Sequence, residues 1–234
     1  MQTLLPFMTH TTPARLPSGA GARHRAQPGR APHEFYPTPP AAIRALLAAE
    51  RFDGSIWEPA CGDGAISKEL IAHGYDVTST DLVDHGYGRH GVDFLATVFP
   101  RGRNIVTNPP YGSGLADRFL RHALSLTRIT GGRVAMLLNI TSLCSPTRHD
   151  SFIRRPPSVL YALDDCVCWP SGKPALATRH TLNHRYVWAV WEPETVPVTT
   201  TAFRWLATAP FTDDAIRTAR RSTRYTSTRT KETA

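Results

Sequence analysis

Apolar positions along the chain fall into two recurring patterns. Apolar residues at helical spacing predict helices over 41–50, 65–73 and 115–126. Short apolar runs, bounded by turn-forming residues, predict strands over 55–59, 75–80, 104–107, 134–138, 159–163 and 186–191. The run at 134–138 is continuous, which is typical of a strand buried on both faces. The alternation of strands and helices therefore predicts an α/β fold, with helices covering a mostly parallel sheet.

Composition indicates the size and the surroundings of this fold. With 234 residues, 41% of them hydrophobic, the chain is long enough for one domain with its own core. No apolar run approaches the roughly 18 residues that a membrane helix needs, so we expect no membrane partner. The four cysteines and ten histidines show neither the spacing of a zinc site nor a disulfide framework. We therefore expect no metal and a reducing, cytoplasmic compartment.

The net charge of +8 is concentrated at the two ends of the chain. Residues 1–33 carry four arginines and no acid, residues 34–215 carry 17 basic against 18 acidic side chains, and residues 216–234 carry six basic side chains against one acid. We interpret 1–33 as a disordered basic arm, 34–211 as the folded domain and 212–234 as a basic C-terminal tail. Such arms favour a polyanionic partner, although tails that only solubilise the protein have the same composition.

A glycine-rich turn, Glu58-Pro-Ala-Cys-Gly62-Asp-Gly64, follows the first predicted strand. Glycines between a strand and a helix let the backbone turn tightly and approach a ligand closely. Asp81 ends the next strand, where an acid can accept hydrogen bonds from ribose hydroxyls. The pattern favours a cofactor that carries adenosine and leaves NAD and S-adenosylmethionine open. Without the acids, the same glycines would indicate an ordinary turn.

The third predicted strand runs into Asn108-Pro109-Pro110-Tyr111. Ligands of open α/β sheets bind beyond the carboxyl ends of the strands, and two prolines fix the backbone there and remove amide donors. The Asn108 side-chain oxygen and the Pro109 carbonyl can then converge as two acceptors beside the flat Tyr111 ring. This arrangement suits a planar amine whose nitrogen lone pair must be freed for attack. The alternative is a rigid turn that Asn108 caps.

These two elements, together with Phe35-Tyr36-Pro37-Thr38-Pro39 upstream, resemble the amino-methyltransferases that modify adenine N6 in DNA, especially small phage-type enzymes. The likeness covers residues 34–192. It implies a Rossmann-like class I methyltransferase fold: a mostly parallel seven-stranded sheet, helices on both faces and an antiparallel C-terminal hairpin strand. It also implies S-adenosylmethionine as cofactor and, in a bacterial or phage-infected cell, DNA as partner, with the target base flipped out or single-stranded.

The resemblance also implies roles for individual residues. The target base would be held by Asn108, Pro109, Pro110 and Tyr111. The cofactor would be held by Tyr36, Pro37 and Thr38 at its methionine end, by Glu58, Ala60, Gly62 and Gly64 in the turn, by Asp81 at the ribose, and by Asp93 and Phe94 at the adenine. The chain has no room for the large recognition domain of other family members. The candidate target-recognition loop is therefore 169–185, with Lys173, Arg179, His180 and His184.

Three other interpretations stay open. The Asn-Pro-Pro-Tyr chemistry is shared with enzymes that methylate RNA or a protein glutamine. A decayed methyltransferase that only binds DNA would keep the fold, but the intact Asn108–Tyr111 element and Asp81 disfavour decay. An NAD oxidoreductase is disfavoured because Ser67 stands where the dinucleotide fingerprint has its third glycine or an alanine.

Overall fold

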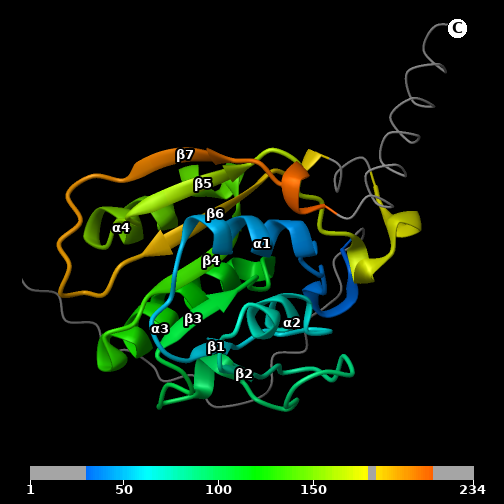
Figure 1. Cartoon of the computed structure of the whole chain (residues 1–234), viewed down its shortest axis with the longest axis horizontal. Helices are drawn as coiled ribbons and strands as arrows, with labels where there is room; N and C mark the ends of the chain where they lie inside the picture. The colour runs from blue at the N-terminus through cyan, green and yellow to red at the C-terminus, as the bar shows by residue number, and fades with distance from the viewer. Residues whose placement is uncertain (1–29, 179–182, 213–234) are drawn as a thin grey trace, which may run out of the picture.

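A single seven-stranded sheet forms the centre of the protein, in the order β2-β1-β3-β4-β6-β5-β7 (Figure 1). The computed structural model describes residues 30–178 and 183–212, so most of the basic arm, nearly all of the tail and part of the candidate recognition loop lie outside the described residues. The strands are β1 (Ile56–Glu58), β2 (Val77–Ser79), β3 (Asn104–Thr107), β4 (Val134–Asn139), β5 (Val159–Leu163), β6 (Tyr186–Trp191) and β7 (Ala202–Leu206). Strand β6 is antiparallel to its neighbours β4 and β5, and the other pairings are parallel.

Helices cover both faces of this sheet. The α-helices are α1 (Pro40–Ala49), α2 (Ala65–Ala72), α3 (Leu115–Thr130) and α4 (Pro146–Arg154). Short 3-10 turns are η1 (Pro32–Glu34), η2 (Phe94–Ala96), η3 (Gly112–Gly114), η4 (Ile140–Cys144), η5 (Pro170–Gly172), η6 (Pro174–Leu176) and η7 (Ala209–Phe211). Figure 1 shows α1 and α2 in front of the sheet.

Alternation along β4 separates the two layers of the core. Ala135 and Leu137 belong to the cluster that contains residues of α1 and α2, whereas Met136 and Leu138 belong to the cluster that contains residues of α3. Successive side chains of a strand point to opposite faces, so α1 and α2 cover one face and α3 covers the other. Strand β4 is therefore buried on both faces, as its continuous apolar sequence predicts.

Two glycines end α3 and return the chain to the sheet. Gly131 has a φ of +64° at the C-cap of the helix, a left-handed conformation that favours glycine. A Cβ atom at Gly132 would lie 1.7 Å from the carbonyl oxygen of Arg103, so a side chain cannot be accommodated there. This close approach lets β4 begin directly beside β3.

The predicted fold is confirmed: the sheet is Rossmann-like and mostly parallel, with helices on both faces and one antiparallel strand. Strand β6 lies inside the sheet, and its Trp188 and Trp191 are fully buried. Helix α4 and strand β7 have no counterpart among the elements that the sequence predicts. The seventh strand, β7, extends the sheet beyond β5 in a segment for which the apolar pattern predicts no strand.

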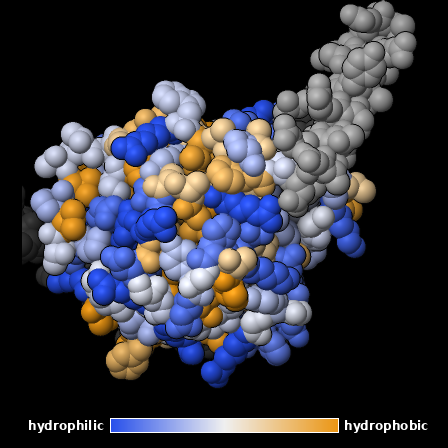
Figure 2. All heavy atoms as spheres, viewed as in Figure 1, coloured by the Kyte–Doolittle hydropathy of each residue, from blue (hydrophilic) through white to orange (hydrophobic). Residues whose placement is uncertain are grey.

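None of the described helices is long and apolar enough to cross a bilayer. Figure 2 shows hydrophilic and hydrophobic residues interspersed over the face that carries α1. The most exposed large apolar side chain among the described residues is Trp205 of β7, at 81%.

Candidate active site

The predicted site residues gather at one edge of the sheet. The parallel strands β1, β2 and β3 end there, at Glu58, Ser79 and Thr107. The glycine turn, Asp81 and Asn108 follow these three ends directly. Topology therefore brings together two motifs that lie more than 40 residues apart in the sequence, at the edge where α/β sheets bind ligands.

Asp81 is tied directly to the glycine turn. Its Oδ2 accepts a hydrogen bond from the backbone amide of Gly62 at 2.8 Å, and its Oδ1 accepts one from the amide of Val83 at 2.9 Å. Gly62 and Gly64 have φ values of +53° and +82°, which favour glycine. A carboxylate has about four lone-pair sites, so Asp81 retains acceptor capacity for hydroxyl groups.

Aromatic side chains that the sequence motifs do not single out cover this turn. A Cβ at Gly62 would lie 2.8 Å from the Phe35 ring, and one at Gly64 would lie 2.5 Å from the Tyr87 ring. The Phe35 ring stacks on His85 with centroids 4.1 Å apart. Residues 82–91 and the segment around Phe35 therefore close over the two glycines, which must lack side chains for these rings to approach.

Glu58 lies behind the turn rather than on its open side. It is 1% exposed, and its carboxylate accepts a very short hydrogen bond from the Ser67 hydroxyl of α2. The Ser67 hydroxyl also lies 2.6 Å from that of Ser79. Burial raises the pKa of Glu58 well above its ordinary value of 4.5, with smaller contributions from nearby acids. The structure thus places Glu58 against α2 and the end of β2.

The Asn108 amide is fixed at both of its polar atoms. Its Nδ2 donates to the carbonyl oxygen of Tyr36 at 2.9 Å, and its Oδ1 lies 2.6 Å from the Tyr111 hydroxyl. That hydroxyl also lies 2.9 Å from the Leu137 carbonyl oxygen in β4. The Pro109 carbonyl accepts no hydrogen bond from the described residues. The acceptors that the element keeps available are therefore this carbonyl and the lone pair of Oδ1 that the Tyr111 hydroxyl does not use.

Burial raises the pKa of the Tyr111 hydroxyl well above its ordinary value, so this group stays a neutral donor. Its ring is half-buried and lies 6.2 Å from the Tyr186 ring, centroid to centroid. Burial also raises the pKa of Tyr186, and the neighbouring Cys168 and Cys166 add a smaller contribution in the same direction. The Tyr111 ring is thus held by its hydroxyl at one end and by β6 beside it.

The segment around Tyr36 connects the two motifs to the candidate recognition loop. The Tyr36 hydroxyl accepts a hydrogen bond from the Ala31 amide at 2.9 Å, and the Phe35 carbonyl accepts one from the Ser171 amide at 2.8 Å. Thr38 is 3% exposed, and its hydroxyl has no partner among the described residues. A buried hydroxyl without a partner is costly, which is consistent with a ligand group at this point.

The structure does not bring every predicted residue to the open edge. Phe94 is 2% exposed and packs in the core, with its ring 5.1 Å from Trp57 and 4.8 Å from Phe119, centroid to centroid. Because the ring is buried among core side chains, it offers no free face for an adenine ring in this conformation. Asp93 caps η2 by accepting the Leu95 amide and is exposed.

The candidate recognition loop is described only in part. Lys173 is exposed, and the His184 ring packs edge-on against Tyr186 at 6.2 Å. Arg179 and His180 lie outside the described residues. Pro37 lies close to this loop, because a Cβ at Gly172 would be 3.6 Å from its ring.

Known proteins resemble this chain in fold rather than in sequence. No protein-family model and no curated protein matches the chain. Among solved structures, a protein from Listeria monocytogenes described as a class I S-adenosylmethionine-dependent methyltransferase superposes with a TM-score of 0.49 and 16% identity, over 80% of this chain and 69% of that one. A modification subunit of a type I restriction enzyme from Vibrio vulnificus gives 0.47 and 16%, over 68% and 44% of the two chains. TrmN from Thermus thermophilus gives 0.40 and 22%, over 65% and 48%.

Each of these three scores is below 0.5, and the chain spans less than half of the modification subunit and of TrmN. These likenesses concern the fold, and the support for a function comes from this chain's own residues. They fit an adenosine-bearing cofactor: Asp81 has free acceptor capacity, the neighbouring Leu82 is 59% exposed and offers an apolar surface, and the Thr38 hydroxyl lacks a partner.

Proposed function

We propose that this protein is a methyltransferase that uses S-adenosylmethionine to methylate the N6 amine of adenine in DNA. The observation that supports it most is the Asn108 amide, which is fixed between the Tyr36 carbonyl and the Tyr111 hydroxyl. This amide stands at the end of β3, at the same sheet edge as the glycine turn and Asp81.

The geometry of Asn108 suits an amine acceptor. Nδ2 is committed to Tyr36, and one lone pair of Oδ1 accepts the Tyr111 hydroxyl. The second lone pair of Oδ1 is the acceptor for a substrate N–H, and the Pro109 carbonyl supplies another. Accepting both N–H bonds favours a pyramidal nitrogen and frees its lone pair. When bound, S-adenosylmethionine would supply an electrophilic methyl group, to which the nitrogen forms a bond as the methyl–sulfur bond breaks. The amine then loses a proton to water, and orientation accounts for most of the rate.

Adenine in DNA is the acceptor that best matches the remaining features. A base inside a duplex is out of reach, so it must be flipped out or single-stranded. The half-buried Tyr111 ring offers such a base a stacking surface, worth about 1–3 kcal/mol in single-strand binding proteins. The Phe35–Pro39 element packs on both motifs, and its resemblance to the DNA-modifying enzymes is what favours DNA over other acceptors.

Asn108→Ala tests the assignment. We expect methyl transfer to DNA, followed with a tritiated methyl group, to fall by about 100- to 1,000-fold or more, as when one polar group is removed from other catalytic sites. Binding of the cofactor, measured by calorimetry, should be retained, which shows that the variant is folded. Near-normal turnover on DNA would show that Asn108 does not hold the amine.

The acceptor is tested separately, by offering wild-type protein DNA, RNA and protein substrates in parallel and then sequencing the methylated bases. Label in N6-methyladenine of DNA is the expected result. Label in RNA or in glutamine would keep the methyltransferase and reject the substrate. No transfer to any of them, with DNA still bound, would indicate a DNA-binding protein that has lost the activity.

A further inference from the structure

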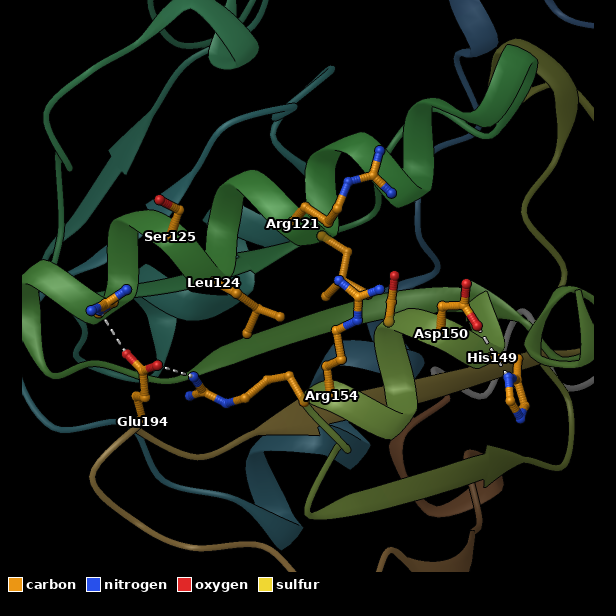
Figure 3. A pocket seen from close by; sticks show the side chains of 11 residues that line it. Arg121, Leu124, Ser125, His149, Asp150, Arg154 and Glu194 are labelled. Atoms are coloured by element: carbon orange, nitrogen blue, oxygen red, sulfur yellow. Dashed lines mark hydrogen bonds and ion pairs between the residues drawn. The ribbon is translucent and has the colours of Figure 1, made fainter. Parts of the chain in front are cut away.

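A groove rich in arginine runs between α3 and α4, on the side of the sheet opposite α1 (Figure 3). Its volume is about 960 Å³. The residues that line it are Leu120, Arg121, Leu124, Ser125, Arg128, His149, Asp150, Ser151, Arg154, Arg155 and Glu194. Leu120 and Leu124 form an apolar floor, and four arginines face two acids along the walls. We call this feature the α3–α4 groove.

Ion pairs hold the two walls together. Near the start of α4, the buried Arg148 donates from Nε to Asp117 of α3 at 2.8 Å. At the other end of the groove, Glu194 lies 3.0 Å from Arg128 of α3 and 3.7 Å from Arg155, the residue that follows α4. The walls are therefore connected at both ends, and Glu194 neutralises the arginines at one of them.

The two other arginines of the groove have no such partner. Arg121 and Arg154 are exposed and form no ion pair or hydrogen bond with the described residues. In Figure 3, Arg121 comes from α3, and the side chain of Arg154 extends from the end of α4 toward α3. Two guanidinium groups without an ion-pair partner among the described residues, above an apolar floor, form a site for an anion that also has an apolar part.

We propose that the α3–α4 groove binds the phosphodiester backbone of a single DNA strand beside the target base. The combination of cationic walls and apolar floor matches the grooves that hold single strands. Helix α3 begins four residues after Tyr111, and Arg121 lies six residues further, about 9 Å along the helix axis. The inference rests on the proposed function, because that function places DNA at Asn108.

The test measures the affinity of the full chain for a fluorescein-labelled single-stranded DNA, by anisotropy, over a series of salt concentrations. Each phosphate contact contributes about 0.7 to the slope of log K against log salt for a single strand. Arg121→Gln with Arg154→Gln should therefore reduce the slope by about 1.4. Arg121→Lys with Arg154→Lys keeps both charges, so this variant should retain most of the wild-type slope. Glu194→Gln, which releases Arg128 and Arg155, should make the slope steeper.

The matched control is Arg51→Gln with Arg101→Gln. These exposed arginines precede β1 and β3, at the edge of the sheet opposite Asn108. Their removal changes the net charge by the same amount. The proposal is overturned if the control reduces the slope as much as the groove variant, or if the groove variant binds like wild type. It is also overturned if the binding of polyglutamate, rather than the binding of DNA, is weakened by the substitutions at Arg121 and Arg154.

Methyl transfer measured on the same preparations separates this proposal from the proposed function. Transfer to DNA by wild type, with an unchanged slope in the groove variant, rejects the groove alone. A slope that depends on the groove, in a protein that methylates no DNA, rejects the proposed function and leaves the groove as a strand-binding surface.

Discussion

The buried Glu58 carboxyl links the candidate site to the stability of the fold. Its raised pKa means that the folded protein binds this proton more tightly than the unfolded chain does. The contribution of Glu58 to the free energy of unfolding should therefore be fully present below pH 4.5 and should decrease as the pH rises toward the folded-state pKa, by up to about 1.4 kcal/mol per pH unit. Glu58→Gln keeps an oxygen for Ser67 and should remove this contribution, so the variant should be more stable than wild type at neutral pH.

Urea unfolding between pH 4.5 and 8 measures this effect. Asp76→Asn is the matched control, because it removes one carboxyl from an exposed position just before β2 and should leave the pH dependence of wild type in place. If Glu58→Gln shows the same decrease with pH as wild type, the ionisation of Glu58 does not contribute to the stability.

Single residues show where sequence reasoning reaches its limit. The positions of Asn108 and Asp81 at strand ends could be predicted, because strand period and turn chemistry are local properties of the sequence. The burial of Phe94 could not, because an Asp-Phe pair has the same sequence whether its ring faces a ligand or, as here, contacts Trp57 and Phe119. The partners of Asn108 likewise depend on a contact with Tyr36, 72 residues away in the sequence.

At the scale of elements, the contact between the glycine turn and residues 82–91 should make the turn intolerant of any side chain at Gly64. Gly64→Ala should lower the free energy of unfolding by more than the roughly 1–2 kcal/mol that a left-handed alanine costs, because its Cβ would also lie 2.5 Å from the Tyr87 ring. Gly74→Ala is the control: its φ of +86° is similar, and nothing lies within 4 Å of its Cβ. Urea unfolding of both variants gives the difference.

Replacing Tyr87 by alanine in the Gly64→Ala background should recover the excess loss, since it removes the ring that the new methyl group meets. Equal losses in Gly64→Ala and Gly74→Ala would show that residues 82–91 do not press on the turn. A separate expectation concerns the cofactor. Calorimetry with S-adenosylmethionine should show weaker binding for Gly64→Ala and unchanged binding for Gly74→Ala, because Gly74 lies beyond the end of α2.

The most deeply buried strands have the clearest signal in the sequence. Strands β4 and β6 are covered on both faces, so each has a recognisable apolar run. Strand β7 has four exposed residues out of five, and its segment lacks that signal; the alternation of Phe203 and Trp205 with small or charged residues was the available clue. The position of β6 between β4 and β5 depends on sheet pairing, which local sequence does not encode.

For the whole molecule, the distribution of charge suggests how a polyanion would be held. The folded body is nearly neutral in total, yet it keeps Arg121 and Arg154 unpaired in the α3–α4 groove. The ends of the chain carry most of the net charge: residues 1–29 and 213–234 together hold nine basic side chains and three acids. We expect the ends to supply sequence-independent phosphate contacts and the groove to align one strand.

Removing residues 1–29 and 213–234 tests the contribution of the ends. The truncated protein should bind DNA more weakly, and the slope of log K against log salt for duplex DNA should become shallower by about 0.9 for each lost phosphate contact. A full-length variant with the nine basic residues changed to glutamine should behave in the same way, because charge rather than chain length is responsible. Combined with the groove substitutions, the losses should add, as expected for separate sites. An unchanged slope in the truncated protein would mean that the ends only keep the protein soluble, and that the contacts with DNA come from the body alone.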